Sequence, residues 1–160
     1  MVSSGKLRLA EVIPTANIIP SLKSARKEGA IKELVALLAA NGSIPKSKAK
    51  DVAQAIADRE KLGSTGIGRG IAVPHVKVSF LKEPVGGMGK SEAGIDFSSL
   101  DGAMTHTVFL FVSPAEPNDK HVSLMSRFVT LIRKPDFVSF LAQTEGGKAL
   151  HDFLKEVDEW

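Results

Sequence analysis

Apolar residues near position 30 recur at the spacing of an α-helix. The pattern is formed by four residues at i, i+3, i+4 and i+7: Ile31, Leu34, Val35 and Leu38. This spacing places their side chains on one face, and the following Asn41-Gly42 is a frequent helix stop. The pattern predicts a helix over residues 31–38. A second helix is expected from Ser47, as its cap, to Glu60, with Val52, Ala55 and Ile56 turned inward.

Three further helices are expected in the last third of the chain. The first begins at a cap formed by Asn118 or Asp119 and presents an apolar stripe of Val122, Met125, Val129 and Ile132. Pro135 ends it, and a short helix follows over residues 137–141. The last helix is outlined by Leu150, Phe153, Leu154 and Val157.

Between these helices the pattern changes to that of strands. Four glycines space out a predicted loop over residues 63–70, which leads into Ile71-Ala72-Val73 and then Pro74-His75. Residues 95–97 and 105–112 are further strand candidates, and the second half of the latter is continuously apolar, as in a strand covered on both faces. Helices before and after a set of strands predict one layered α/β domain over residues 1–160.

Composition and charge narrow the function. Of the 160 residues, 43% are hydrophobic and 24% are charged, enough to bury a core without metals or disulfides. A net charge of +3 does not make a nucleic-acid-binding protein. The absence of cysteine excludes cysteine nucleophiles, iron–sulfur clusters and thiolate zinc sites. Residues 1–10 lead into no signal-peptide run, and the longest apolar stretches are too short to span a bilayer, so a cytoplasmic protein without membrane insertion is expected.

Two glycine-rich segments imitate nucleotide-binding motifs. Gly89-Lys90-Ser91 matches the end of a P-loop, but Pro84 stands where that loop requires glycine, and a strand pattern follows where a helix is required. The glycines of residues 66–70 miss the dinucleotide fingerprint because Ile71 occupies its third glycine position. No two histidines are four residues apart. No nucleotide, metal or other cofactor is therefore expected.

His75 is the most promising reactive residue. It follows a proline at a strand end, beside a loop whose glycines let backbone N–H groups approach an anion. An imidazole is largely neutral at pH 7 and carries a free nitrogen lone pair, which makes it a nucleophile toward phosphorus. A histidine after proline is also commonly a packed or solvated loop residue, so the residues alone leave both interpretations open.

The run over residues 59–75, REKLGSTGIGRGIAVPH, resembles the signature of a known family. The family is the EIIA component of the bacterial phosphoenolpyruvate-dependent sugar phosphotransferase system, in its fructose, mannitol and nitrogen-regulatory class. The strand over residues 108–114, the segment HVSLM over residues 121–125 and the closing helices are similar in order and spacing. The resemblance covers about residues 7–157 and implies a three-layer α/β sandwich with a mixed central sheet.

The resemblance also implies site residues. His75 occupies the place of the histidine that accepts the phosphoryl group, and His121 that of the family's second histidine. Arg59 matches the arginine that precedes the glycine loop, and Ser64 and Thr65 would line the phosphoryl-binding site. Judged without the family, His121 is equally a capping or exposed helix-start residue, Arg59 is a solvated charge at a helix end, and Ser64-Thr65 is ordinary turn chemistry.

The implied activity is that of a phosphohistidine carrier. It would accept a phosphoryl group from phospho-HPr and pass it to an EIIB protein or domain in fructose- or mannitol-type sugar uptake. The alternative is a nitrogen-regulatory EIIA that controls regulatory protein targets and has no sugar substrate. A nucleic-acid protein is a third possibility, on a basic patch of Lys46, Lys48, Lys50 and Lys61, but such charges usually form a solvated helix face.

Other residues near the signature receive lesser roles. The family usually has a small residue directly after the active histidine, whereas this chain has Val76, whose branched side chain would narrow a partner's approach. Ile67, Ile71 and Val76 are expected to contribute to an apolar rim around His75. Arg69 is interpreted as a surface residue. His106, within a strand, and His151, on the last helix, are interpreted as structural.

Overall fold

Strand β6 (Thr105–Pro114) forms the centre of the sheet in the computed structural model, which describes residues 7–160. β5 (Val85–Ile95) pairs antiparallel with one edge of β6, and β3 (Ile71–Ala72) and β4 (His75–Val78) both pair parallel with the other. β1 (Ile18–Ile19) joins β5, and β2 (Gly66–Gly68) joins β3, to give the order β1-β5-β6-β3-β2. The predicted central strand and mixed sheet are confirmed.

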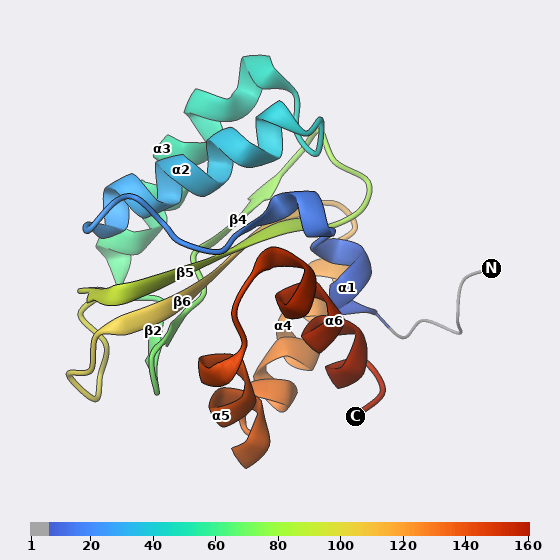
Figure 1. Cartoon of the computed structure of the whole chain (residues 1–160). Helices are drawn as coiled ribbons and strands as arrows, with labels where there is room; N and C mark the ends of the chain where they lie inside the picture. The colour runs from blue at the N-terminus through green and yellow to red at the C-terminus, as the bar shows by residue number, and fades with distance from the viewer. Residues whose placement is uncertain (1–6) are drawn as a thin grey trace.

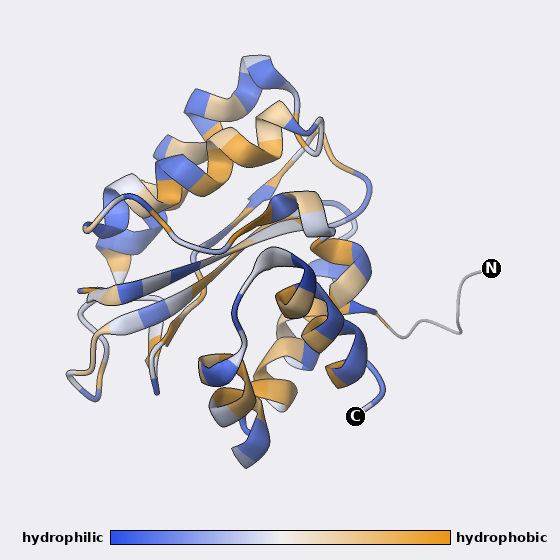
Figure 2. Cartoon of the chain, in the orientation of Figure 1, coloured by the Kyte–Doolittle hydropathy of each residue, from blue (hydrophilic) through white to orange (hydrophobic). Residues whose placement is uncertain are grey.

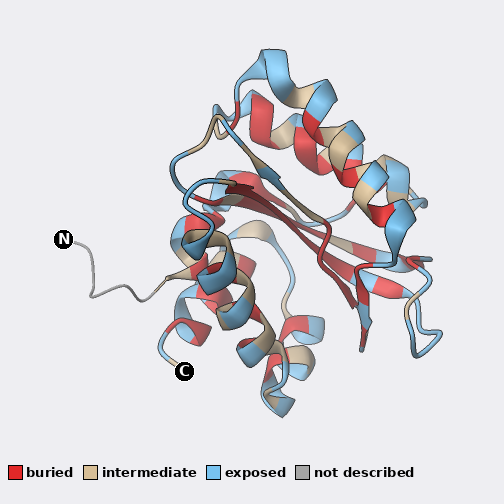
Figure 3. Ribbon diagram, turned by 180° about the vertical axis from the view of Figure 1, so that it is seen from behind, coloured by how far each residue is buried: buried red, intermediate tan, exposed pale blue. Residues whose placement is uncertain are grey.

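Helices cover both faces of this sheet (Figure 1). One face carries α2 (Lys27–Ala40) and α3 (Ala49–Leu62), packed on Val108, Leu110 and Val112 of β6. The other face carries α1 (Leu9–Val12), α4 (Asp119–Ile132), α5 (Pro135–Gln143) and α6 (Gly147–Val157), packed around Phe109 and Phe111. Figure 2 shows the apolar sides of the helices turned toward the strands, and Figure 3 shows the strands buried between them. The expected three-layer sandwich is confirmed.

The expected apolar stripe of α4 is only partly turned inward: Met125 and Ile132 pack against the core, but the most buried residues are others. Leu124, Phe128 and Leu131 are fully buried, whereas Val122 is 55% exposed. Phe128 decides the rotation of the helix, because its ring lies 4.9 Å from Phe109 and 5.4 Å from Phe111 between ring centroids. The helix therefore turns Val122, beside His121, toward the surface.

The expected start of α3 is also wrong in detail. Ser47 lies within a short 3-10 helix, η2 (Lys46–Lys48), and Lys48 occupies the N-cap position without a side-chain hydrogen bond.

Strand β5 was not predicted over most of its length because glycines interrupt its pattern. A Cβ atom at Gly86 would lie 2.8 Å from the ring of Phe111, and one at Gly89 would lie 2.7 Å from Leu22. Glycine therefore stands where core side chains approach the strand backbone closely. The segment Gly89-Lys90-Ser91 lies inside this strand, which confirms that it is not a P-loop.

The predicted loop over residues 63–70 contains a strand as well. β2 and β3 form a small hairpin, and Arg69 and Gly70 adopt φ values of 58° and 83° at its turn. Two consecutive positive φ values are typical of tight hairpin turns, where glycine is favoured. After the second strand of the hairpin, β3, the chain continues through Val73 and Pro74 to His75.

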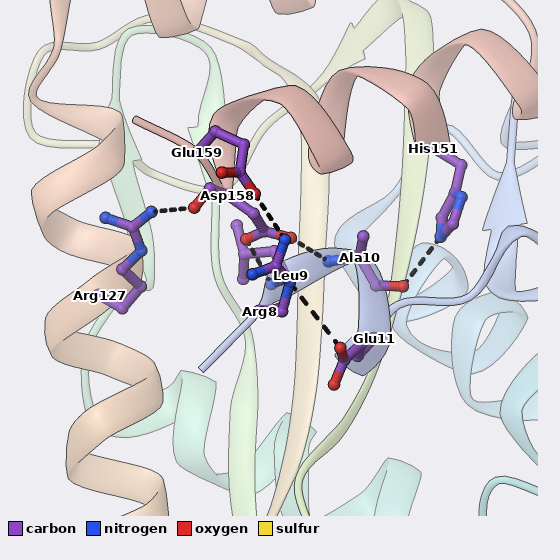
Figure 4. A network of polar contacts seen from close by, with 8 residues as sticks. All are labelled: Arg8, Leu9, Ala10, Glu11, Arg127, His151, Asp158 and Glu159. Atoms are coloured by element: carbon purple, nitrogen blue, oxygen red, sulfur yellow. Dashed lines mark hydrogen bonds and ion pairs between the residues drawn. The ribbon is translucent and has the colours of Figure 1, made fainter. Parts of the chain in front are cut away.

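The two ends of the described chain are joined on the α1–α6 side of the molecule (Figure 4). The Asp158 carboxylate accepts hydrogen bonds from the backbone N–H groups of Leu9, at 2.7 Å, and Ala10, at 2.9 Å. Arg127 of α4 donates to the carbonyl oxygen of Asp158. Asp158 thus satisfies N–H groups at the start of α1 that have no partner within the helix. Within residues 7–160, no helix combines the length and apolar character needed to cross a bilayer.

Candidate functional site

His75 is the first residue of β4. Val73 and Pro74 separate β3 from β4, and both short strands pair with the same side of β6, which places His75 in register with Phe111 and Val76 in register with Val112. Phe111 faces the α4 side of the sheet and Val112 the α3 side. Because side chains alternate along a strand, His75 shares the face that α4 covers.

The His75 ring is held by one backbone hydrogen bond. Its Nδ1 lies 2.7 Å from the carbonyl oxygen of Val73, which can only accept, so Nδ1–H is the donor. In the neutral ring the lone pair is then on Nε2. The half-buried ring therefore presents Nε2 as its nucleophilic atom.

His121 lies beside His75, as the family resemblance implies. It occupies the first turn of α4, and the two ring centroids are 5.6 Å apart. Within the described residues, the buried Nδ1 of His121 has no hydrogen-bond partner. Burial, together with the positive charges that His75 and Lys77 can carry, lowers the pKa of His121 below its ordinary value of 6.5. His121 therefore lies beside His75 with a ring nitrogen that no group within residues 7–160 satisfies.

Lys77 is a cation of the site that sequence reasoning missed. It lies two residues after His75 on β4, and therefore on the same face, and its Nζ donates to Oδ1 of Asn118 at 3.3 Å. Asn118 immediately precedes α4. The period of two along a strand, counted from His75, would have indicated Lys77.

Arg59 lies in the last turn of α3, shortly before the loop that leads to the site. Its Nη1 donates to the carbonyl oxygen of Gly63 at 3.0 Å. Among residues 7–160, no hydrogen bond joins its guanidinium to His75 or His121. The structure brings the two histidines together and holds Arg59 at the end of α3, bound to the adjacent loop through the carbonyl oxygen of Gly63.

Ser64 and Thr65 use their side chains within the loop itself. The Ser64 hydroxyl donates to the carbonyl oxygen of Phe97 and accepts from Gly66 N–H. The Thr65 N–H and hydroxyl donate to the two oxygens of Glu60, at 2.9 and 2.6 Å. A direct phosphoryl-binding role for either residue remains a prediction, and Glu60 is a second site neighbour that sequence reasoning missed.

The expected apolar rim is corrected by the packing. Ile71 is buried in the core on the α4 side, and Val76 packs against the core on the α3 side, across the sheet from His75. Neither side chain can border the approach to His75, so Val76 does not narrow it. Ile67 is exposed, on β2.

The remaining candidates make backbone contacts. Arg69 Nη1 donates to the carbonyl oxygen of Ile132, His106 Nδ1–H to that of Ser91, and His151 Nε2–H to that of Ala10. These hydrogen bonds agree with the structural interpretation of both histidines. Residues 7–160 contain no cluster of three or more His, Asp or Glu side chains suited to hold a metal ion.

The pKa of His121 gives a testable pH dependence. The unfolded chain takes up this proton near pH 6.5 and the folded chain only at lower pH, so the contribution of His121 to stability is lost as the pH falls from 6.5 toward the folded pKa. Replacing Lys77 by Met removes one charge that opposes protonation and is expected to raise the His121 pKa. Titration of the ring carbon protons by NMR measures both values; a wild-type pKa at or above 6.5 would contradict the desolvation argument.

The family is shown by comparison with known sequences. The model of the phosphoenolpyruvate-dependent sugar phosphotransferase system EIIA 2 family matches residues 11–157. The fructose-specific EIIABC component of Bacillus subtilis is 32% identical over 96% of this chain, which spans 24% of that protein's length. A nitrogen regulatory protein of Pseudomonas aeruginosa is 26% identical over 94% of this chain and 97% of its own.

Solved structures share the fold. The nitrogen regulatory protein IIA-Ntr from Neisseria meningitidis superimposes with a TM-score of 0.81 at 23% identity, over 91% of this chain and 98% of that one. The enzyme IIA of mannitol from Escherichia coli, solved in complex with phosphorylated enzyme IIB, gives a TM-score of 0.70 at 23% identity, over 88% and 95%. The sequence match and the architecture agree, and the chain belongs to the EIIA type 2 family of the phosphoenolpyruvate-dependent sugar phosphotransferase system.

Proposed function

We propose that the chain is a cytoplasmic phosphohistidine carrier that accepts a phosphoryl group from phospho-HPr on His75 Nε2 and passes it to an EIIB protein or domain. The observation that carries the proposal is the pair of neighbouring rings: Nδ1–H of His75 is bound to Val73, and His121 lies 5.6 Å away with an unpaired nitrogen. The family supplies phosphoryl-transfer components, which supports the reaction type.

The transfer is an in-line displacement at phosphorus. The Nε2 lone pair of His75 forms the new N–P bond while the N–P bond to the donor's histidine breaks, and the donor's imidazole leaves with that electron pair. His121 and Lys77 stabilise the charge on the phosphoryl oxygens, since both lie on the His75 side of the sheet. Arg59 would join them by exchanging its Gly63 carbonyl for a phosphoryl oxygen. In the second transfer, a nucleophile of the EIIB acceptor attacks the phosphorus in line, and the N–P bond to His75 breaks.

Docking of an EIIB protein is supported by the fold. The mannitol enzyme IIA of E. coli, which has this architecture, forms a complex with phosphorylated enzyme IIB. The exposed Val122, next to His121 on α4, would supply apolar surface for a partner that reaches His75.

The second candidate function is nitrogen-type regulation, in which the phosphorylation state of His75 controls binding to a regulatory protein. It is favoured by the nitrogen regulatory protein of P. aeruginosa, which matches over most of both chains. Because the relatives include both fructose-specific and nitrogen regulatory proteins, similarity alone does not separate the two functions. They differ in the protein that receives the phosphoryl group or binds the phosphorylated chain.

The test uses the full chain with phosphoenolpyruvate, enzyme I and HPr. We expect the mass of one phosphoryl group, which acid removes, as for a phosphohistidine. The labelled chain is then mixed with a fructose-type EIIB: transfer supports sugar uptake, whereas retention of the label together with phosphorylation-dependent capture of a regulatory protein supports the second function. Absence of labelling would overturn both.

A further inference from the structure

We infer that Glu60 is the positioning residue of the phosphoacceptor: through Thr65 and Val73 it fixes which nitrogen of His75 is free to react. This inference rests on the proposed function and adds to it Glu60, which lies in the signature run over residues 59–75 but received no role in the sequence analysis. Glu60 touches neither His75 nor the site of transfer, so it acts through the loop between them.

Glu60 is a buried carboxylate with an unusual set of partners. It is 4% exposed, and within the described residues both its oxygens bind Thr65 and no cation forms an ion pair with it. A buried carboxylate is costly unless hydrogen bonds compensate it. Since Thr65 supplies both its N–H and its hydroxyl, the carboxylate and Thr65 hold each other in one arrangement.

From Thr65 the contacts continue to the reactive ring. The carbonyl oxygen of Thr65 accepts the N–H of Val73 at 3.0 Å, and the carbonyl oxygen of Val73 accepts Nδ1–H of His75 at 2.7 Å. The N–H and C=O groups of one residue belong to different peptide groups, so Glu60 acts on the ring by fixing the positions of Thr65 and Val73. The series Glu60, Thr65, Val73, His75 therefore connects the end of α3 to the tautomer of His75.

The same helical turn also carries Arg59. Arg59 and Glu60 are consecutive at the C-terminal end of α3, and their partners, Gly63 and Thr65, are two residues apart in the loop. The pair anchors the loop at two points, one on the exposed side and one on the buried side. Release of Glu60 would loosen both the cation and the His75 ring.

The consequence for reactivity lies in the neutral ring. An imidazole without a fixed partner distributes its proton over both nitrogens, and only the Nδ1–H form leaves Nε2 as a nucleophile. A ring that can also rotate loses the in-line geometry, and misplacement of a reacting group by about 1 Å costs up to about 10²-fold in rate. Glu60 is thus expected to affect the rate of transfer more than the binding of the partner.

The experiment compares Glu60→Gln, Glu60→Ala and Thr65→Val with the wild type. Nitrogen-15 NMR of the unphosphorylated chain reports the tautomer of His75 directly. We expect the Nδ1–H form in the wild type and a mixture of forms in Glu60→Ala. Phosphoryl transfer from phospho-HPr is expected to show a kcat lowered about tenfold or more in Glu60→Ala, with KM little changed. Glu60→Gln, which keeps one oxygen for Thr65, is expected to retain part of the rate.

A matched control is available on α2. Glu33 likewise uses its carboxylate to hold a loop, by accepting the backbone N–H groups of Lys23 and Ser24, but its loop does not lead to His75. Glu33→Gln is expected to leave the tautomer and kcat unchanged. If folded Glu60→Ala keeps a single Nδ1–H tautomer and the wild-type kcat, the inference is wrong. If Glu60→Ala does not fold, Thr65→Val and Glu60→Gln decide by the same two measurements. If the wild type accepts no phosphoryl group, the proposed function fails, while the NMR result still decides the role of Glu60.

Discussion

Replacement of His75 by alanine is expected to abolish acid-labile phosphorylation of the chain. In the proposed function the His75 ring is the nucleophile, its Nε2 is the atom left with the lone pair, and the chain has no cysteine to replace it. The measurement is intact mass after incubation with phosphoenolpyruvate, enzyme I and HPr, before and after acid treatment. The expected signal for His75→Ala equals that of a reaction without phosphoenolpyruvate.

Alanine variants of two other histidines serve as controls, because they show whether loss of any imidazole has the same effect. His106→Ala removes a ring that donates to the Ser91 carbonyl and is expected to leave labelling unchanged. His121→Ala keeps the nucleophile but removes a donor to the phosphoryl group, and slower transfer by about 100-fold, with the same final labelling, is expected. Phosphorylation of His75→Ala to the wild-type level would overturn the assignment of the nucleophile.

The pairing of the two histidines could be predicted from the sequence, but its surroundings could not. His75 and His121 carry a signature in their local sequence context, and the structure brings their rings to 5.6 Å. The signature run contains Glu60 but does not show its partner, and Lys77 lies outside the run. The contacts of both depend on a loop that folds back on α3 and on the face that β4 turns toward α4. Charged residues in an isolated pattern are indistinguishable from solvated surface.

Val76 shows how a single strand register changes an interpretation. From the sequence, its position next to His75 suggested an obstacle to the partner. In the sheet, neighbours along a strand point to opposite faces, and Val76 packs among the side chains beneath α3. The departure from the family pattern therefore lies on the α3 side of the sheet, where Val76 is partly buried against the core.

The helices and the central strand were predictable because their apolar periodicity is strong, and β5 was not because its pattern is interrupted. At its glycines 86 and 89 a Cβ atom would lie within 3 Å of Phe111 and Leu22, so a side chain there would require these residues to shift. A contact across the sheet or from a distant loop leaves no periodicity in the strand itself. The same limitation explains the α4 face, which Phe109 and Phe111 of β6 determine through Phe128.

Replacement of Asp158 by alanine is expected to destabilise the fold by about 2–3 kcal/mol. The carboxylate is completely buried and accepts the N–H groups of Leu9 and Ala10, so its loss removes charge-assisted hydrogen bonds and leaves two donors at the start of α1 without partners. Leu9 is itself fully buried, which limits access of water to its N–H group. Urea unfolding measures the change as a lower midpoint at an unchanged m value.

Glu159 provides the control, because it is the adjacent acidic residue and pairs with Arg8 at 2.6 Å while its side chain is 67% exposed. Glu159→Ala is expected to cost less than about 1 kcal/mol, since exposed ion pairs contribute little. Asp158→Asn should lie between the two, because an amide oxygen accepts one N–H group while its NH₂ faces the other. Equal midpoints for Asp158→Ala and Glu159→Ala would show that the junction between α1 and the C-terminal residues does not depend on the buried carboxylate. A large difference would show that this one side chain ties the first helix of the described chain to its last, on the face of the sheet that also carries α4 and His121.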